Sequence, residues 1–234
     1  MQIDTLFRAS ALDPAYLEEA EHSLETLLQH AYRKQVLYHQ FLYGRVPTQQ
    51  ALLEDYAFLV RALLSGYAYT FKEPYLELVD TLAAEAVKRF YREGRWYLSD
   101  DGFDSPADLS DRYYTSQLSV MIGNLLGLAA LQENLEQYAL AETTLHRYAY
   151  LLDRNPSHYP EATRAMLRYK TGDVVLKANR EKLEVMRAEI GQIGYPYLLV
   201  KPEATDRFLA CRVGSCFAQA PSLEAIRKEI EALR

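Results

Sequence analysis

Three stretches of the sequence repeat one pattern: LDPAYL at residues 12–17, FKEPYL at residues 71–76 and QENL at residues 132–135. Each is a polar turn that ends on Tyr or Leu and opens a segment with helically spaced apolar residues. Tyr16 lies 59 positions before Tyr75, and Tyr75 lies 60 positions before Leu135. Helices that recur at a fixed period of this size predict stacked helical hairpins, each of which buries its apolar stripe on its neighbour.

Two kinds of helix alternate along the repeat. Residues 52–69 and 116–131 are apolar almost all round, which is typical of buried inner helices. The segments that follow Pro14, Pro74 and Asn134 are amphipathic, and Pro is suited to the first position of a helix. Residues 1–171 are therefore predicted to form a domain of antiparallel helical hairpins, which ends in a shorter helix opened by Pro160.

The pattern changes twice along the chain. Between Phe90 and Tyr114, a brief alternation and the turn SDDG (residues 99–102) indicate a short β-hairpin or an ordered loop. From Gly172 onward, two short β-type runs at residues 174–176 and 197–200 flank a helical segment, which predicts parallel strands joined by a crossover. A third strand and a final helix complete a small βαβ-containing α/β subdomain over residues 172–234.

Composition excludes several classes of function. The 234 residues carry a net charge of −6, which gives no basic surface for nucleic acid or an anionic membrane. No apolar run approaches the roughly 18 residues of a membrane span, and residues 1–5 do not resemble a signal peptide. We expect a cytoplasmic protein without a cofactor.

The two cysteines lie close together in the sequence, at Cys211 and Cys216. A two-residue turn at Gly214-Ser215 would place the thiols diagonally, near or beyond the roughly 7 Å Cα separation that a disulfide allows. A turn at Val213-Gly214 would place them opposite each other, but Val resists a positive φ. Two reduced thiols are predicted.

Several segments resemble the C-terminal half of one protein family. They are LEDYAFL at residues 53–59, the turns at Tyr16-Leu17 and Tyr75-Leu76, and LACRVGSC at residues 209–216 followed by Pro221. These segments are similar to those of the YyaL-like proteins, in which a thioredoxin-like domain precedes a six-hairpin α/α barrel related to N-acylglucosamine 2-epimerases. The family's Ser-Gly-Asn motif at the start of an inner helix corresponds here to Thr115-Ser116-Gln117, which lacks the Gly and the Asn.

The resemblance implies a mainly α fold, with helical hairpins that form part of a six-hairpin glycosidase-like α/α barrel, and a carbohydrate-enzyme ancestry. It also implies that the thioredoxin-like domain and the first hairpins lie outside this chain. Two functions follow: a binding or scaffold module, or the alternative of a sugar-processing enzyme half of the epimerase, isomerase or glycosidase kind. Apolar faces along the helices of Phe58 and Ile122 would then be open. This predicts self-association or binding of a separate N-terminal barrel half or thioredoxin-like domain, beside a small sugar ligand.

Two carboxylates are the candidate catalytic groups. Asp55 lies in the first turn of one inner helix, and Asp111 lies just before the next. Facing one cavity, they would suit general acid and base roles. Both also suit the ends of helices, where a carboxylate caps backbone N–H groups, so capping remains the alternative.

Candidate substrate-binding residues surround these carboxylates, since aromatic rings stack on sugar faces and polar groups bind hydroxyls. The alternative is that tyrosines fill helix contacts and that His39 is a solvated or core histidine. No pair of the five histidines has the close spacing of metal ligands on a helix, so no metal site is predicted. The substrate-binding candidates are His39, Tyr56, Trp96, Tyr97, Tyr113, Tyr114 and Ser116.

Overall fold

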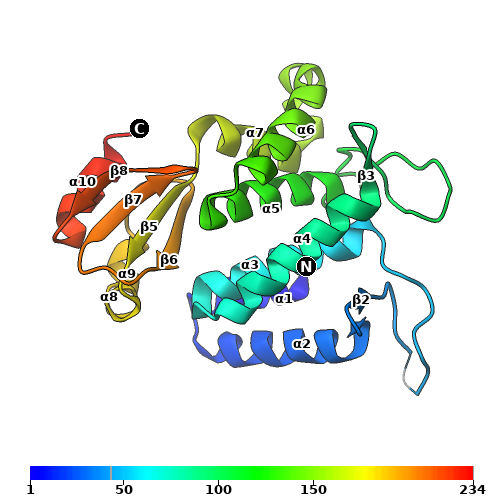
Figure 1. Cartoon of the computed structure of the whole chain (residues 1–234), viewed down its shortest axis with the longest axis horizontal. Helices are drawn as coiled ribbons and strands as arrows, with labels where there is room; N and C mark the ends of the chain where they lie inside the picture. The colour runs from blue at the N-terminus through cyan, green and yellow to red at the C-terminus, as the bar shows by residue number, and fades with distance from the viewer. Residues whose placement is uncertain (43, 234) are drawn as a thin grey trace. The chain divides into compact units, whose positions relative to one another are not determined.

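A computed structural model describes residues 1–42 and 44–233 of the chain (Figure 1). It is mainly helical with a small sheet, as predicted, and the sheet has four strands where three were expected. The chain divides into two compact units, and each is described separately below. The first unit comprises Met1–Asn124 and Arg147–Thr163, and the second comprises Leu125–His146 and Arg164–Arg234.

The first unit is built on four helices near the N-terminus: α1 (Gln2–Ala9), α2 (Ala15–Ala31), α3 (Leu53–Thr70) and α4 (Glu73–Phe90). Pro14 and Pro74 lie at the starts of α2 and α4, as the repeat predicts. Helix α3 packs against α4 and α1. Sequence analysis did not identify α1, whose Phe7 is fully buried.

The two apolar helices have the predicted bounds to within one residue. They are α3 and α5 (Gln117–Gln132), and α5 continues from the first unit into the second. Leu63 in α3 and Ile122 and Leu125 in α5 are completely buried, whereas Phe58 is only half-buried. The apolar face expected to be open is thus covered at Ile122, and self-association stays a prediction.

Each of α2 and α4 runs directly into a short β-hairpin. Strands β1 (Tyr32–Arg33) and β2 (Val36–Leu37) form the first hairpin, and β3 (Tyr91–Arg92) and β4 (Arg95–Trp96) form the second. Both turns have two residues with positive φ, at 51° and 64° in the first and 52° and 74° in the second, which matches a type I′ turn. A β-hairpin or an ordered loop was predicted between Phe90 and Tyr114, but the hairpin turns at Glu93-Gly94 instead of at residues 99–102, and the first hairpin was not predicted.

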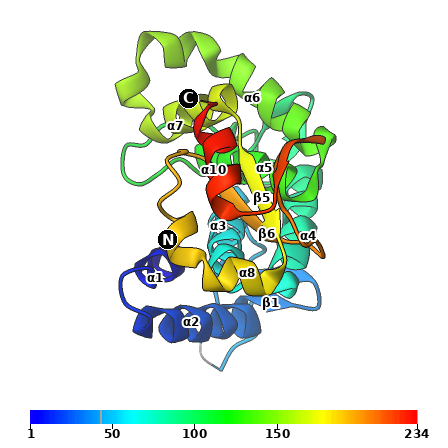
Figure 2. The ribbon, with the colours of Figure 1, turned by 90° about the vertical axis from the view of Figure 1, so that its left-hand side faces the viewer.

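The second unit carries the four-stranded sheet, in the order β6-β5-β7-β8. Strand β5 (Val174–Ala178) is parallel to β6 (Leu198–Pro202), as predicted, and α8 (Arg180–Val185) and α9 (Arg187–Ile190) lie between them in the chain. Strand β7 (Phe208–Arg212) is antiparallel to both β5 and β8 (Ser215–Ala220). Helix α10 (Leu223–Glu231) packs against β7 and β8 (Figure 2).

The boundary predicted near Thr171 marks the change from helices to sheet, but the compact units divide elsewhere. Helices α6 (Leu135–Arg154) and α7 (Pro160–Thr171), with a short 3₁₀ turn (Pro156–His158) between them, each continue from one unit into the other. None of the helices in the described part of the chain combines the length and apolarity that a membrane crossing requires.

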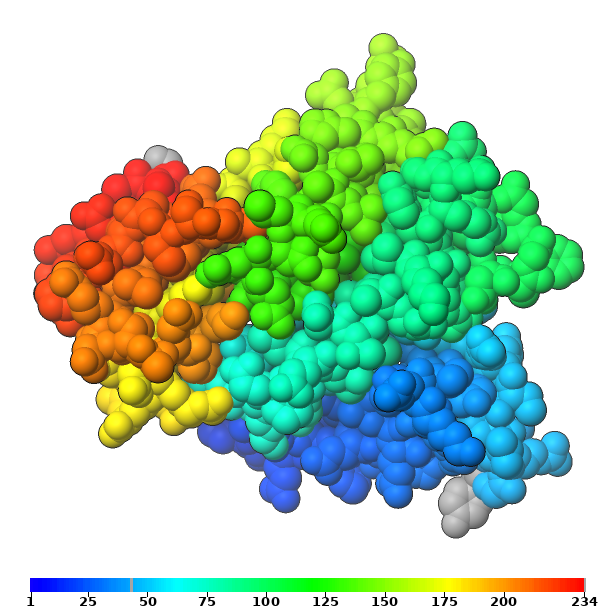
Figure 3. Space-filling model, in the orientation of Figure 1, coloured from blue at the N-terminus to red at the C-terminus, as the bar shows by residue number. Residues whose placement is uncertain are grey.

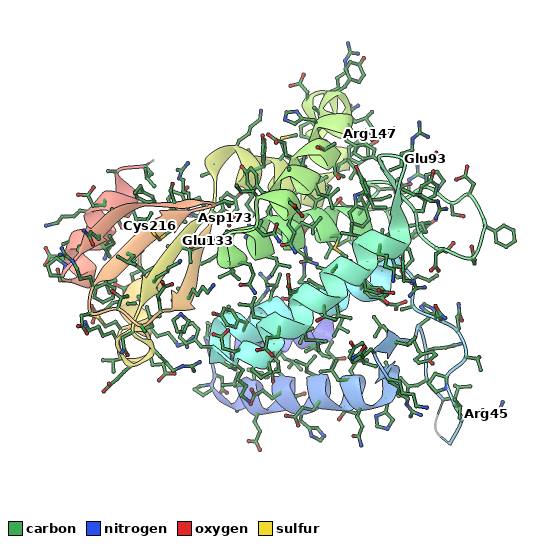
Figure 4. All side chains as sticks on the ribbon, in the orientation of Figure 1. Arg45, Glu93, Glu133, Arg147, Asp173 and Cys216 are labelled. Atoms are coloured by element: carbon green, nitrogen blue, oxygen red, sulfur yellow. A yellow bond between two sulfur atoms is a disulfide. The ribbon has the colours of Figure 1, made fainter. Side chains whose placement is uncertain are left out.

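The prediction of two reduced thiols is wrong, because Cys211 and Cys216 form a disulfide. The β7–β8 register pairs Arg212 with Ser215 and Cys211 with Cys216, so the turn is at Val213-Gly214. Only Gly214 has a positive φ there, 84°, as in a type II turn, and Val213 avoids the strain that sequence analysis assigned to it. Figure 4 labels Cys216 on β8.

Candidate functional site

A pocket of about 420 Å³ lies in the first unit, between α1, α2, the segment after β2 and the start of α3. Its walls are largely apolar and include Leu27, Phe41 and Phe58. Its polar lining residues include His39, Glu54 and Asp55. We refer to it as the smaller pocket.

His39 reaches this pocket because the first β-hairpin turns the chain back onto α2. The backbone N–H of Tyr38 donates to Ala31 O at 2.8 Å, and the N–H of His39 donates to Gln49 O at 3.0 Å. The His39 side chain then lies beside the first turn of α3, where His39 Nδ1 is 2.9 Å from Asp55 Oδ2. Two candidates from the sequence are thereby brought together.

Asp55 also caps its own helix. Its Oδ2 accepts a hydrogen bond of 2.8 Å from the backbone N–H of Leu52, directly before α3. Burial raises the pKa of the Asp55 carboxyl above its usual value, and the hydrogen bonds from Leu52 and His39 act in the opposite direction. Asp55 therefore has both roles: it caps α3 through Leu52, as the capping alternative predicts, and it also contacts His39 in the pocket.

Glu54, which sequence analysis did not select, is fixed by Tyr114. The Tyr114 hydroxyl donates to Glu54 Oε2 at 2.6 Å, and this bond to a carboxylate raises the pKa of Tyr114. One potential ligand atom from each of His39, Glu54 and Asp55 lies within 4.8 Å of the others. The search for histidine pairs overlooked this group, because it combines one histidine with two consecutive acidic residues 15 and 16 positions later.

A second pocket, of about 730 Å³, also lies in the first unit and is called the larger pocket below. Its walls are residues 108–114, the first residue of α5, and the segment from the end of α6 to residue 159. Four tyrosines line it, together with acidic and basic groups that include Asp111 and Arg112. The tyrosines are Tyr113, Tyr114, Tyr148 and Tyr159.

Asp111 holds two walls of the larger pocket together. Its Oδ1 accepts from the backbone N–H of Ser116 at 2.6 Å, and its Oδ2 accepts from the N–H of Glu161, in the first turn of α7, at 3.1 Å. Glu161 also forms an ion pair with Arg61 of α3. Both carboxylate oxygens of Asp111 are therefore engaged by the main chain.

Ser116 is a buried cap rather than an exposed pocket group. It is 2% exposed, its hydroxyl donates to Asp108 O at 2.7 Å, and its Oγ accepts from the N–H of Ser119 at 3.1 Å. These bonds fix the start of α5 and the position of residue 108. Ser116 thus supports the wall of the larger pocket without lining it.

Three aromatic candidates line neither of these two pockets, because they are buried in structural contacts. Tyr56 is 1% exposed, and its hydroxyl accepts a 3.1 Å hydrogen bond from Arg89. Trp96 is 2% exposed and lies 5.3 Å from the ring of Tyr91. Tyr97 is 8% exposed, with the Arg92 guanidinium 3.7 Å from its ring centre. For Tyr56, Trp96 and Tyr97, the alternative is therefore correct: they are buried packing residues and line neither of the two pockets.

Tyr113 and Tyr114 are the exposed aromatic candidates, at 95% and 47%. They belong to the long connection between β4 and α5, which projects at the surface (Figure 3). Tyr148, from α6, completes the aromatic lining and was missed, although it lies within the third repeat at a position where helix α6 approaches this connection. Its hydroxyl donates to Ala107 O at 3.3 Å.

Neither the protein-family models nor the curated proteins compared with this chain give a match.

Proposed function

We propose that this chain is a binding module for a small polyhydroxylated ligand, of the size of a mono- or disaccharide, and that the larger pocket is its binding site. The observation that carries the proposal is the combination of four tyrosines with charged groups around one cavity of about 730 Å³. This volume lies within the range of roughly 300–1,000 Å³ that small-molecule sites occupy.

The chemistry of the lining fits such a ligand. A sugar has apolar C–H faces and a rim of hydroxyls. Tyrosine offers a flat apolar ring and a hydroxyl in one side chain. Asp108, Arg112 and Gln117 add acceptors and donors at the rim. Tyr113, which is 95% exposed, is available to stack on a sugar face.

Binding is favoured over catalysis by the positions of the two carboxylates. The alternative, a sugar-processing enzyme half, needs Asp55 and Asp111 at a single cavity. Asp55 lines the smaller pocket, and Asp111 lines the larger one. Since both Asp111 oxygens accept from backbone N–H groups, Asp111 is suited to shaping the cavity and poorly suited to exchanging protons with a ligand.

The resemblance to the YyaL-like proteins suggests the wider setting. In this proposal, the helical hairpins form part of a six-hairpin α/α barrel, and the module serves a thioredoxin-like domain or a separate N-terminal barrel half. The alternation of apolar helices α3 and α5 with amphipathic α2, α4 and α6 supports this view.

The test is a titration of the whole chain with mono- and disaccharides, including N-acylated amino sugars, followed by protein NMR. We expect millimolar or tighter binding by at least one sugar, with shifts at Tyr113, Tyr148 and Tyr159. Tyr113→Ala should weaken that binding by about fivefold, because it removes a stacking contact worth roughly 1 kcal/mol.

Tyr150→Ala is the matched control. Tyr150 is also an exposed tyrosine, at 67%, but it lies against the Arg154 guanidinium on α6 and does not line the larger pocket. Its substitution should leave binding unchanged. The proposal fails if no sugar shifts these tyrosines at about 10 mM, a concentration that exposes even millimolar affinity, or if both variants lose binding equally.

A further inference from the structure

Beyond sugar binding, we propose that His39, Glu54 and Asp55 form a site for one divalent transition-metal cation, of the Zn²⁺ or Mn²⁺ kind. The site lies in the smaller pocket, and none of its three ligands lines the larger pocket, although Tyr114, which holds Glu54, does. It requires only side chains that the fold already brings together.

The geometry supports three ligands from two segments of chain. One potential ligand atom from each residue lies within 4.8 Å of the other two, a spacing that a single ion of about 2.0–2.2 Å bond length bridges after small side-chain rotations. His39 comes from the segment after β2, and the two carboxylates come from the first turn of α3. Three protein ligands leave one position for water or a small molecule from the pocket.

The donor set selects the kind of cation. One imidazole and two carboxylates match transition metals, whereas Ca²⁺ and Mg²⁺ prefer oxygen ligands alone. The two carboxylates also balance the charge of a divalent ion. His39 and Asp55 are part-buried, at 31% and 21% side-chain exposure, so the ion would be partly shielded from water but reachable through the pocket.

Further contacts hold the ligands in place, which metal sites need. The Leu52 N–H fixes Asp55 through Oδ2, and the Tyr114 hydroxyl fixes Glu54 through Oε2. A carboxylate has about four lone-pair positions, so each group keeps acceptor capacity for an ion. Both carboxylates are thus oriented by neighbours that do not block coordination.

The second hairpin provides an internal contrast. His39 and Leu98 follow the two hairpins at equivalent places, since the N–H of His39 bonds Gln49 O and the N–H of Leu98 bonds Ser105 O. The backbone conformation at this position therefore does not require a histidine. The histidine is a feature of the first hairpin alone, and it faces the pair of carboxylates.

The experiment is calorimetric titration of tag-free protein with ZnCl₂, followed by Co²⁺ absorption spectroscopy to report the coordination. We expect one equivalent to bind, with nitrogen and oxygen ligands. His39→Leu, which installs the residue of the second hairpin, should weaken Zn²⁺ binding by at least about tenfold, and Glu54→Gln should do the same.

His22→Leu is the control, since His22 is an exposed histidine on α2 outside both pockets. It should bind Zn²⁺ as the parent chain does. Far-UV circular dichroism of each metal-free variant tests whether it folds. If His39→Leu does not fold, the Zn²⁺ affinity of Glu54→Gln tests the proposal.

Three results would overturn the proposal: no stoichiometric Zn²⁺ or Co²⁺ binding below about millimolar concentration, equal affinity in His39→Leu, or Mg²⁺ binding as tightly as Zn²⁺. Tyr113→Ala should retain metal binding, and His39→Leu should retain sugar binding. Failure of this site is therefore separable from failure of the sugar site.

Discussion

Two segments of the chain, α2 through α3 and α4 through α5, have matching backbone hydrogen bonds but different side chains. They are called the first and second segments below. In the first, the N–H of Tyr38 donates to Ala31 O at 2.8 Å, and in the second the N–H of Tyr97 donates to Phe90 O at the same distance. These pairs lie 59 positions apart (97 − 38 and 90 − 31). The connection after each hairpin also returns in the same way, through Ala51 N–H to Leu37 O and Ala107 N–H to Trp96 O.

The same two positions carry different chemistry in the two segments. His30 and Phe41 stack in the first, with ring centres 5.1 Å apart. Their counterparts 59 positions later, Arg89 and Asp100, form an ion pair with two N–H···O bonds of 2.7 and 2.8 Å. Main-chain hydrogen bonds thus define the shape of the segment, and its side chains are free to build a different pocket beside each copy.

The largest expected effect tests how much the second segment depends on its ion pair. Arg89 is 9% exposed and also donates to Tyr56 and to Ala51 O. Arg89→Met should lower the free energy of unfolding by about 3 kcal/mol, because it leaves those acceptors unpaired while Asp100 remains partly solvated. Urea unfolding at neutral pH provides the measurement.

The matched change in the first segment is His30→Ala, which removes the ring contact with Phe41 and an exposed hydrogen-bonding contact of 2.8 Å between His30 Nδ1 and Thr26 O. It should cost less than about 1 kcal/mol. If the two substitutions lower the free energy of unfolding equally, the ion pair stabilises the protein no more than the stacked rings do. The two segments would then not differ in stability.

A smaller effect is expected where the second segment joins α7. Asp111→Ala removes the acceptor for the N–H groups of Ser116 and Glu161, so unfolding free energy should fall by about 2 kcal/mol. Asp108→Ala serves as the control. Asp108 is exposed, and its carboxylate accepts from the nearby N–H of Ser110, which predicts a loss of about 0.5 kcal/mol. Equal stability of Asp111→Ala and the parent chain would contradict the structural role of Asp111.

The smallest effect concerns the two turns, whose second central residues are Gln35 at φ 64° and Gly94 at φ 74°. Gly94→Gln should destabilise the protein by about 1 kcal/mol, and Gln35→Gly should stabilise it by about 0.5 kcal/mol. A Cβ at residue 94 would meet only Arg147 Nη1, at 3.6 Å, so the expected cost is conformational (Figure 4 labels Arg147 and the preceding turn residue, Glu93).

Thermal unfolding of Gly94→Gln and Gln35→Gly measures these changes in stability, with Lys34→Ala as the control. Lys34 also has a positive φ, 51°, and alanine brings no relief there. A shift of the same sign for both exchanges would show that the turns do not respond to backbone strain alone.

Strong periodicity made the helices predictable. Segments 52–69 and 116–131 match α3 and α5 because apolar residues dominate both; α5 is buried at nearly every position, whereas ten residues of α3 are buried. The parallel pair β5–β6 followed from two short β-type runs separated by a helix. The first hairpin gave no such signal, because Lys34 and Gln35 are rare choices for a type I′ turn.

The same missing hairpin limited the prediction of the site. His39 was expected near the candidate carboxylates, and the structure places it beside Asp55. It did not anticipate Glu54 as a third polar group, since that depends on where the hairpin directs residue 39. Trp96 and Tyr97 were candidates for substrate binding, but they are buried, and main-chain hydrogen bonds join them to Ala107 and to Phe90 at the end of α4.

The division of the chain also has a consequence for the order in which it folds during synthesis. Residues Arg147–Thr163 of the first unit emerge from the ribosome only after Leu125–His146, which belong to the second. Domains that are contiguous in sequence tend to fold one after another as they appear, N-terminal first. Here the first unit cannot complete the wall of the larger pocket until Tyr148 and Tyr159 have been synthesised. Nascent chains arrested before residue 147 would therefore carry the His39 cluster but lack half of the tyrosine pocket.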